Sequence, residues 1–485
     1  MKATPEQEHA IDLAVGGGSL KIEAYAGTGK TTTLAAISKA IGPEKRGMYL
    51  AFNRAIADEA QRKFPGHVDC RTAHSLAYRA MGYRFKNRLQ RVTGKGVAEI
   101  LSLPPEYAAM SAAAAGGMIL DIVNRFTQSA DTEIKDSHVP WHLLNGVLPD
   151  AARVIAGELQ IKARKLWEMM SDLSGTVPVT HDTYLKLWAL GNPRIHADFI
   201  LFDEAQDANP VMMDLVRRQS AQAIWVGDRF QQIYTFRGAV NAMERIETDH
   251  SCKISQSFRF GEEVARVANA VLSAHLGAKT DIKGTPSIKS RIERHPNPEA
   301  ILCRTNALVI DQVVKAIDKE QDVAVVGGVT ELIALLYGAH DLRSGKRAAV
   351  PDLAIFKAWG ELVEYADTET GKDMALLVRL VEKNNVFDLI DTLKETQDIT
   401  EADADVVVST AHKAKGREWE SVRLTNDFRQ PGDENYEKED SNLLYVAATR
   451  AISTLDAIDC KAIEEALTDK PKAQPKTKHI IRPRM

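Results

Sequence analysis

The stretch that decides the fold lies near the N-terminus and reads Ala24-Tyr25-Ala26-Gly27-Thr28-Gly29-Lys30-Thr31. It follows a short apolar run at 20–24 and precedes an apolar helical pattern at 32–41. A glycine-rich turn between a strand and a helix lets backbone N–H groups surround phosphate oxygens at the positive end of the helix. In such a loop Lys30 would reach the β- and γ-phosphates, and the Thr31 hydroxyl would bind Mg²⁺. The stretch therefore predicts a phosphate-binding loop, with compact Ala24 at a position that is usually glycine.

A second stretch, Asp203-Glu204-Ala205-Gln206-Asp207, directly follows the apolar run 199–202. A carboxylate at the carboxyl end of a parallel strand can reach a metal ion bound at a phosphate loop of the same sheet. Asp203 is therefore the candidate Mg²⁺ ligand. Glu204 is the candidate base that orients and deprotonates an attacking water.

Short apolar runs recur along the chain, each followed by a helical pattern. One set lies at 20–24, 48–52, 199–202 and 223–226, and another lies at 300–303, 323–326, 406–410 and 422–424. Strands that alternate with helices predict parallel α/β sheets. The two sets predict two such cores in tandem.

The intervals between these runs predict the domain organisation. We expect a first core at 1–82 and 191–250 and a second core at 251–328 and 403–469, with mainly helical insertions at 83–190 and, shorter, at 329–402. Inside the first insertion, the small residues of 112–117 predict a loop before a helical stretch at 118–129. Residues 470–485 contain six Lys or Arg, three Pro and no acidic residue, which predicts a flexible basic tail.

Composition excludes several classes of protein. With 485 residues, 44% hydrophobic and 26% charged, the chain is not disordered throughout, collagen-like or a coiled coil. No apolar run approaches the roughly 18–20 residues of a membrane span, so we expect no membrane association. The spacing of Cys70, Cys252, Cys303 and Cys460 fits neither a disulfide framework nor a zinc site, and predicts reduced thiols. We expect a protein of the cytoplasm or the nucleoid, including those of a phage-infected cell.

The net charge of −4 neither indicates nor excludes binding to nucleic acid, because a basic groove can lie on a mildly acidic body.

Further motifs carry a family resemblance. The stretch 203–207, together with Val226-Gly-Asp-Arg-Phe-Gln-Gln-Ile-Tyr-Thr-Phe-Arg-Gly-Ala239, resembles superfamily 1 helicases of the UvrD/Rep type. The family's other motifs follow in order at 4–7, 51–54, 72–75, 256–259, 410–418 and 444–450. The stretches 51–54 and 180–188 are most similar to the F-box DNA helicase branch. No F-box precedes the phosphate loop here, so the likeness is to the motor part of that branch.

The resemblance implies two RecA-like P-loop cores that use ATP and Mg²⁺. It implies catalytic roles for Glu204 as base, Gln231 as γ-phosphate sensor, and Arg259 and Arg450 as arginine fingers of the second core. The implied nucleotide contacts are Gln7 and Phe258 at the adenine, Glu418 at the ribose, and Ala26, Gly27, Thr28, Gly29, Lys30, Thr31 and Thr32 at the phosphates. The implied metal ligands are Thr31 and Asp203.

The resemblance also implies a track for a single nucleic-acid strand. The matching residues are Phe52, Asn53, Thr72, His74, Tyr234, Phe236, Arg237, Thr410 and His412. Aromatic rings at such positions stack on bases without reading sequence, at about 1–3 kcal/mol per base. Core packing is the alternative for Phe52 and Phe236. The third motif lacks the Gln-Leu-Pro typical of the 5′→3′ branch, so the implied direction is 3′→5′.

The function expected from these residues is an ATP-dependent translocase and helicase of single-stranded DNA and single/double-strand junctions, acting in replication, recombination or repair. One alternative is a translocase that mainly strips DNA-bound proteins, such as recombinase filaments. Another is an ATP-gated nucleic-acid-binding subunit of a larger complex, and a third is an RNA motor. The second insertion is short for a UvrD-type accessory domain, which leaves its contacts with duplex open. The sequence does not predict the oligomeric state.

Overall fold

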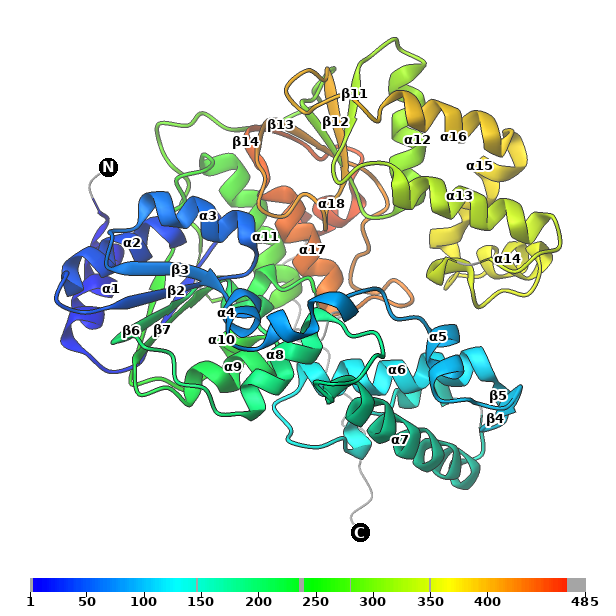
Figure 1. Cartoon of the computed structure of the whole chain (residues 1–485). Helices are drawn as coiled ribbons and strands as arrows, with labels where there is room; N and C mark the ends of the chain where they lie inside the picture. The colour runs from blue at the N-terminus through cyan, green and yellow to red at the C-terminus, as the bar shows by residue number, and fades with distance from the viewer. Residues whose placement is uncertain (1–2, 145–146, 235–239, 280, 349, 469–485) are drawn as a thin grey trace. The chain divides into compact units, whose positions relative to one another are not determined.

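The computed structural model describes residues 3–144, 147–234, 240–279, 281–348 and 350–468 (Figure 1). The chain divides into two compact units. The first comprises Met1–Ala24 and Gly29–Ile254, and the second comprises Tyr25–Thr28 and Ser255–Met485. Each unit is built around one six-stranded parallel sheet, which confirms the expected α/β class with two tandem cores.

The first sheet has helices on both faces. Its strand order is β3 (Val68–Thr72), β2 (Gly47–Ala51), β6 (Phe199–Phe202), β7 (Gln222–Gly227), β1 (Leu20–Ala24) and β8 (His250–Ile254). Helices α1 (Pro5–Gly16), α2 (Lys30–Ile41) and α3 (Arg54–Lys63) cover one face, and α9 (Pro210–Arg217) and α10 (Ala242–Arg245) cover the other. Because both faces are covered, strands such as β6 are apolar at every position instead of alternating.

Strand β8 corrects the expected border between the cores. We placed the end of the first core at residue 250, but β8 continues to Ile254 and pairs with β1 in parallel, from Leu20 opposite His250 to Ala24 opposite Ile254. The apolar pattern of the sequence does not predict this strand, because β8 lies at the sheet edge. Only Ile254 is fully buried there, and the other four positions are partly or largely exposed. An edge strand of this kind has little apolar signal.

The expected insertion at 83–190 contains most of a helical bundle with its own apolar core. Its main elements are α5 (Gly94–Ile100), α6 (Ala112–Gln128), α7 (Pro149–Ser171) and α8 (His181–Leu190), joined by α4 (Ala73–Ala80) of the core. Shorter elements are η1 (Gly82–Arg88), β4 (Glu106–Tyr107), β5 (Met110–Ser111), η2 (Asp136–His138) and η3 (Trp141–Leu144). Phe85, Ile119, Phe126, Leu159 and Leu166 are buried at its centre.

The predicted loop at 112–117 is wrong, because these residues form the first turns of α6. Alanine has the highest helix propensity, and the Ser111 hydroxyl caps the helix by accepting a hydrogen bond from the Ala114 N–H at 3.3 Å. Gly116 serves close packing, since a Cβ there would lie 2.1 Å from the Gly94 carbonyl oxygen of α5. The small residues therefore indicate a tight helix pair.

The second sheet has the order β11 (Val323–Val325), β12 (Val406–Thr410), β10 (Ala300–Cys303), β13 (Trp419–Leu424), β14 (Ala451–Asp456) and β9 (Arg291–Ile292). Helices α11 (Glu262–Leu276), α17 (Lys438–Ala448) and α18 (Lys461–Thr468) pack together in this unit. Helix α12 (Asn306–Ile317) packs on β10 and β12. The remaining elements are η4 (Ala205–Asp207) and η5 (Arg229–Gln231) of the first unit and η7 (Pro351–Leu353) of the second.

The helices of the expected second insertion share the apolar core of their sheet. They are α13 (Thr330–Arg343), α14 (Trp359–Ala366), α15 (Lys372–Lys383) and α16 (Val386–Glu395), and their buried residues join those of α12, β11 and β12 in one cluster. This segment is therefore continuous with the second core, unlike the bundle of the first unit.

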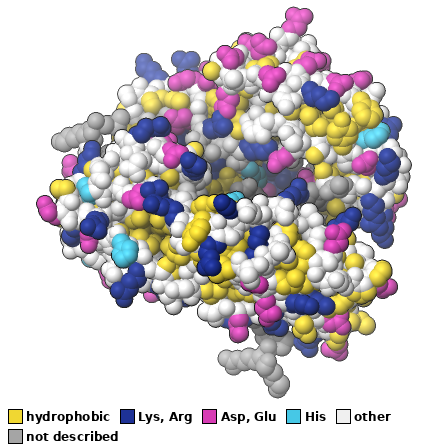
Figure 2. Space-filling view, viewed as in Figure 1, with side chains coloured by type: hydrophobic (Ala, Val, Ile, Leu, Met, Phe, Trp, Pro, Cys, Tyr) yellow, Lys and Arg dark blue, Asp and Glu magenta, His cyan; other side chains and the backbone are white. Residues whose placement is uncertain are grey.

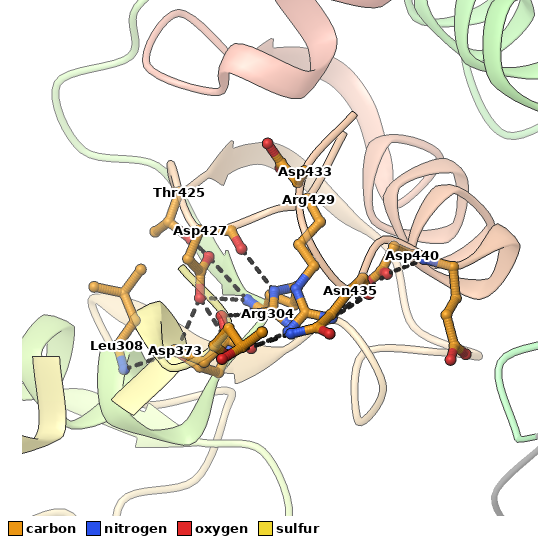
Figure 3. A network of polar contacts seen from close by, with 12 residues as sticks. Arg304, Leu308, Asp373, Thr425, Asp427, Arg429, Asp433, Asn435 and Asp440 are labelled. Atoms are coloured by element: carbon orange, nitrogen blue, oxygen red, sulfur yellow. Dashed lines mark hydrogen bonds and ion pairs between the residues drawn. The ribbon is translucent and has the colours of Figure 1, made fainter. Parts of the chain in front are cut away.

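A polar network also fixes α15 to the second core (Figure 3). The Asp373 carboxylate accepts hydrogen bonds from Arg304, which follows β10, and from Arg429, which follows β13. The Asp427 carboxylate accepts from the Thr305 N–H at 2.8 Å and the Thr425 hydroxyl at 2.7 Å. Side chains from two separate segments, 304–305 and 425–429, thus hold the start of α15 in place.

The visible surface carries both signs of charge. Figure 2 shows Lys and Arg interspersed with Asp and Glu, in keeping with the small net charge. Among the described residues, no helix combines the length and the apolar character needed to cross a bilayer.

Candidate nucleotide and nucleic-acid site

The phosphate loop has the backbone that its glycines predict. Gly27 and Gly29 have φ values of 72° and 76°, in the left-handed region that favours glycine, and Gly29 is the N-cap of α2. The loop residues 25–28 contact their own unit: the Gly27 carbonyl accepts from the Phe258 N–H at 2.8 Å. A Cβ on Gly27 would lie 2.4 Å from the Ser257 hydroxyl oxygen, so no other residue fits there.

The first unit brings both acidic candidates to the start of α2. Lys30 Nζ lies 3.5 Å from the Glu204 carboxylate, and the Thr31 hydroxyl donates to the Asp203 carboxylate at 3.1 Å. The Tyr49 hydroxyl donates to the same Asp203 oxygen at 2.7 Å, a contact that the sequence did not predict. Strand β7 lies between β6 and β1, so these contacts span one intervening strand of the sheet.

Burial sets the protonation of this cluster. Burial and the neighbouring Glu204 raise the pKa of Asp203 above its usual range, against the Tyr49 hydrogen bond and the Lys30 charge. Burial also raises the pKa of Tyr49, which keeps its hydroxyl protonated as a donor. A cation placed at Asp203 would favour the ionised carboxylate.

The residues present fit a magnesium ion. The Thr31 hydroxyl and the Asp203 carboxylate supply hard oxygen ligands within 3.1 Å of each other. Mg²⁺ is commonly held by one or two protein oxygens together with water and substrate phosphates. Thr31 and Asp203 would therefore hold the ion beside the phosphate loop.

A chain of hydrogen bonds joins the two predicted catalytic residues of the first unit. Gln206 donates to the Glu204 carboxylate and accepts from the Asp228 N–H at 3.0 Å, and Gln231 donates to the Asp228 carboxylate at 2.7 Å. Glu204 has a φ of 52°, in the left-handed region that residues with a side chain rarely adopt. Gln206 and Asp228 lie inside the quoted motifs, yet no pattern assigned them this linking role.

Gln7 is fixed at the start of α2 by its own helix. Its amide oxygen accepts from the Thr4 N–H at 3.0 Å in a capping box, and its amide nitrogen donates to the Thr33 hydroxyl at 3.0 Å. The side chain is buried, whereas Thr32 is exposed. The adenine role of Gln7 and the phosphate role of Thr32 stay predictions.

The second unit brings Arg259, Glu418 and Arg450 together. Arg259 Nε lies 2.5 Å from the Glu418 carboxylate and its guanidinium donates to the Thr449 carbonyl at 3.2 Å. Arg450 is almost fully buried and donates to the carbonyls of Val446 at 2.8 Å and Arg417 at 3.1 Å. The predicted finger Arg259 and the predicted ribose contact Glu418 are thus paired with each other, and their roles at a nucleotide stay predictions.

Three predicted strand contacts of the first unit, Phe52, His74 and Tyr234, line one cavity of about 460 Å³. Its lining includes Phe52, His74, Asp182, Met212 and Tyr234. The Phe52 and Tyr234 rings are stacked, with centroids 5.9 Å apart and planes 8° apart. Phe52 is 38% exposed and follows the end of β2, so core packing does not explain it.

His74 is held inside this cavity by a residue that sequence reasoning missed. Its Nε2 lies 2.9 Å from the Asp182 carboxylate at the start of α8. Burial, the largest single influence, raises the pKa of Asp182, but the hydrogen bonds from His74 and Gln128 and the charges of His74 and His181 together lower it below its usual value. Asp182 falls in the 180–188 stretch, which was noted only as a family likeness.

The other predicted strand contacts have local structural roles or lie elsewhere. The Asn53 side chain caps α3 through the Ile56 N–H at 2.9 Å, and the Thr72 hydroxyl caps α4 through the Ser75 N–H at 3.1 Å. Thr410 ends β12 in the second unit, with His412 two residues on. Phe236, Arg237 and the tail at 470–485 lie outside the described residues.

These features define a nucleotide-binding α/β protein with a phosphate loop. Comparisons with known proteins agree. Residues 7–237 match the family model for an AAA domain, and residues 354–461 match that for a UvrD-like helicase C-terminal domain. The chain belongs to the UvrD-like helicases of superfamily 1, as its motifs indicated.

Two curated relatives are similar to nearly the whole chain. The F-box DNA helicase 1 of Gallus gallus is 31% identical over 93% of this chain and 48% of its own length. The F-box DNA helicase protein 1 of Schizosaccharomyces pombe is 31% identical over 96% of this chain and 59% of its own length. The chain thus spans about half the length of these relatives.

Proposed function

We propose that this protein is an ATP-driven DNA helicase that moves 3′→5′ along single-stranded DNA. The observation that carries the proposal is the pairing of Lys30 with Glu204 and of Thr31 with Asp203 at the start of α2. The names of the two relatives support DNA as the substrate.

The geometry of the first unit supports the following route of hydrolysis. A water attacks the γ-phosphorus of ATP, its proton passes to the Glu204 carboxylate, and the bond to the β,γ-bridging oxygen breaks to release ADP and phosphate. Lys30, now paired with Glu204 at 3.5 Å, exchanges that partner for phosphate oxygens when nucleotide binds. A bound Mg²⁺ would neutralise further phosphate charge at Thr31 and Asp203.

The hydrogen-bond chain from Glu204 to Gln231 supports a link between hydrolysis and movement. Gln231 precedes Tyr234 by three residues, and Tyr234 stacks on Phe52 beside the 460 Å³ cavity. A change at the γ-phosphate that moves Gln231 would therefore shift the ring that grips a base. Stacking of this kind holds a strand without reading its sequence.

The test measures ATP turnover with and without single-stranded DNA or RNA, followed by unwinding of duplexes with either a 3′ or a 5′ tail. We expect stimulation by DNA and unwinding from a 3′ tail, with Glu204→Gln as the inactive control. Preference for a 5′ tail would overturn the polarity, and stronger stimulation by RNA would make the protein an RNA motor.

A second candidate is a translocase that mainly strips proteins, such as recombinase filaments, from single strands. The similarity to F-box DNA helicases favours it. Filament removal that is fast while unwinding is slow would support this role. A clamp without transport would instead show strand binding that depends on ATP but not on Glu204. Either activity would serve replication, recombination or repair, and we place the protein with DNA in the cytoplasm or nucleoid.

A further inference from the structure

A second cavity, of about 860 Å³, lies in the first unit at the amino ends of its strands. Arg46 directly precedes β2 and Asp198 directly precedes β6, and both line this cavity. Asp203 follows the other end of β6. At about 3.3 Å per residue, the five steps from Asp198 to Asp203 along β6 place the cavity roughly 16 Å from the nucleotide site. A ligand here would leave ATP binding unobstructed.

The cavity has firmly held walls. The Gln219 side chain accepts from the Ile195 N–H at 2.9 Å and donates to the Pro193 carbonyl at 3.1 Å, which fixes the segment that leads into β6. The Asp198 carboxylate accepts from the Arg46 N–H at 2.7 Å and joins that segment to β2. The shape is therefore set before any partner arrives, which lowers the cost of binding.

The charge of the lining is positive. Its ionisable members are Arg46, Arg194, His196, Asp198 and Arg218. Arg218 is paired with Asp214 at 2.7 Å. Arg46 and Arg194 are exposed, and among the described residues neither guanidinium has an ion pair or hydrogen bond. Two free guanidinium groups thus face solvent at this cavity, in a chain whose net charge is −4.

The lining also offers an apolar surface, formed by Ala189, Pro193, Ile195, Ala197 and Leu215.

A guanidinium matches a carboxylate through two parallel hydrogen bonds. Duplex DNA presents a convex row of phosphates and would leave the apolar floor unused. The chain's own basic tail would be repelled. An acidic segment with apolar side chains could pair its carboxylates with the arginines and pack its apolar side chains on this apolar surface.

We propose that this cavity is a docking site for an acidic peptide segment of a partner protein. Carboxylates of the segment pair with Arg46 and Arg194, and an apolar side chain packs on Ile195 and Leu215. The proposal does not depend on the direction or substrate of the motor, because the cavity and the nucleotide site lie at opposite ends of the sheet.

The test uses a short fluorescent peptide of alternating Glu and Leu, and a matched peptide with Gln in place of Glu. Fluorescence anisotropy is measured with the full chain, with Arg46→Gln/Arg194→Gln, and with the charge-matched control Arg84→Gln/Arg91→Gln, whose side chains are exposed elsewhere in the unit. We expect the acidic peptide to bind the full chain and the control alike. The double variant at the cavity should bind it at least about tenfold more weakly, which corresponds to about 1.4 kcal/mol.

Several results would overturn the proposal. They are no binding of the acidic peptide, equal binding of the Gln peptide, or equal binding by the Arg46→Gln/Arg194→Gln variant. Tighter binding of duplex DNA that is lost in the same variant would assign the cavity to nucleic acid instead. An unchanged melting temperature in the variant shows that lost binding does not reflect unfolding.

Discussion

Two lysines of the first unit have little exposed surface but different partners: Lys186 is almost fully buried, and Lys30 is partly buried. Lys30 Nζ lies 3.5 Å from the Glu204 carboxylate, and the Lys30 side chain is 11% exposed. Lys186, on α8 of the helical bundle, donates to the carbonyls of Ser129 and Asp131 at 2.6 Å each and lies 4.3 Å from the centre of the Phe126 ring. A carboxylate partner can be exchanged for phosphate, whereas fixed carbonyls cannot. In this pair, the kind of partner separates the predicted site residue Lys30 from the structural residue Lys186.

Two arginines sharpen the comparison. Arg88 donates to the carbonyls of Val177 at 2.7 Å and Asp172 at 2.6 Å, and so fixes the chain beyond α7. Arg450 also donates to backbone carbonyls, yet its motif resembles that of an arginine finger. Fixed backbone carbonyls as partners indicate a structural role for Arg450, whereas its motif indicates a catalytic one. The two arguments disagree at this residue.

The largest effect is expected for Glu204→Gln. The change removes the base but keeps the size and the hydrogen bond from Gln206, so ATP should still bind while turnover falls by about 10⁴-fold. Single-turnover hydrolysis and nucleotide binding measure the two separately. Turnover within a few-fold of the wild type would exclude Glu204 as the base.

Arg450→Ala tests the disagreement between partner and motif. If Arg450 acts on charge that develops in the transition state, turnover falls by about 10³-fold with little change in ATP affinity. Comparison of kcat, nucleotide affinity and melting temperature on one preparation decides the matter. A large fall in melting temperature with a proportionate loss of every activity would make Arg450 a structural residue.

The sequence predicted the parts of the molecule that depend on local patterns. The apolar runs gave the central strands, and the motifs gave Lys30, Thr31, Asp203 and Glu204, which the structure brings together. It did not predict the partly exposed edge strand β8, because an edge has little apolar signal. Contacts made by residues far apart in sequence, such as Tyr49 with Asp203 and His74 with Asp182, have no local pattern at all.

Arg88→Met should lower the stability of the helical bundle without removing catalysis. The change removes the guanidinium that donates to the carbonyls of Val177 and Asp172 and to the buried Met170 carbonyl, at about 1–3 kcal/mol for each group that water cannot reach. Thermal unfolding measures the loss, and ATP turnover well below the melting temperature should persist. A loss of turnover with unchanged stability would contradict the structural role.

Lys186→Met should cost about 1–3 kcal/mol for the same reason and should also change the pH dependence. Burial lowers the pKa of Lys186 to about 8, although Asp131 opposes the shift. The unfolded chain has the usual lysine pKa of about 10.4, so between these values the unfolded state holds more protons and wild-type stability rises with pH. The contribution of neutral Lys186 to the free energy of unfolding is complete above the unfolded pKa and is lost as pH falls through 8. Melting temperatures of the wild type and Lys186→Met at pH 8 and pH 10 test this prediction. If the melting temperature rises equally in both between these pH values, another group is responsible for the pH dependence.

The smallest effect is expected for Phe52→Ala, at the exposed edge of the strand cavity. Loss of one stacking ring should weaken single-stranded DNA binding by about 1–3 kcal/mol. Because Phe52 is 38% exposed, the melting temperature should fall much less than for a buried aromatic residue, whose truncation costs about 3–5 kcal/mol. Tyr83→Ala, at a ring that is 55% exposed on η1, is the matched control and should leave DNA affinity unchanged. An equal loss of DNA affinity in both variants would show a general surface effect. A large fall in the melting temperature of Phe52→Ala would show that this ring packs in the core.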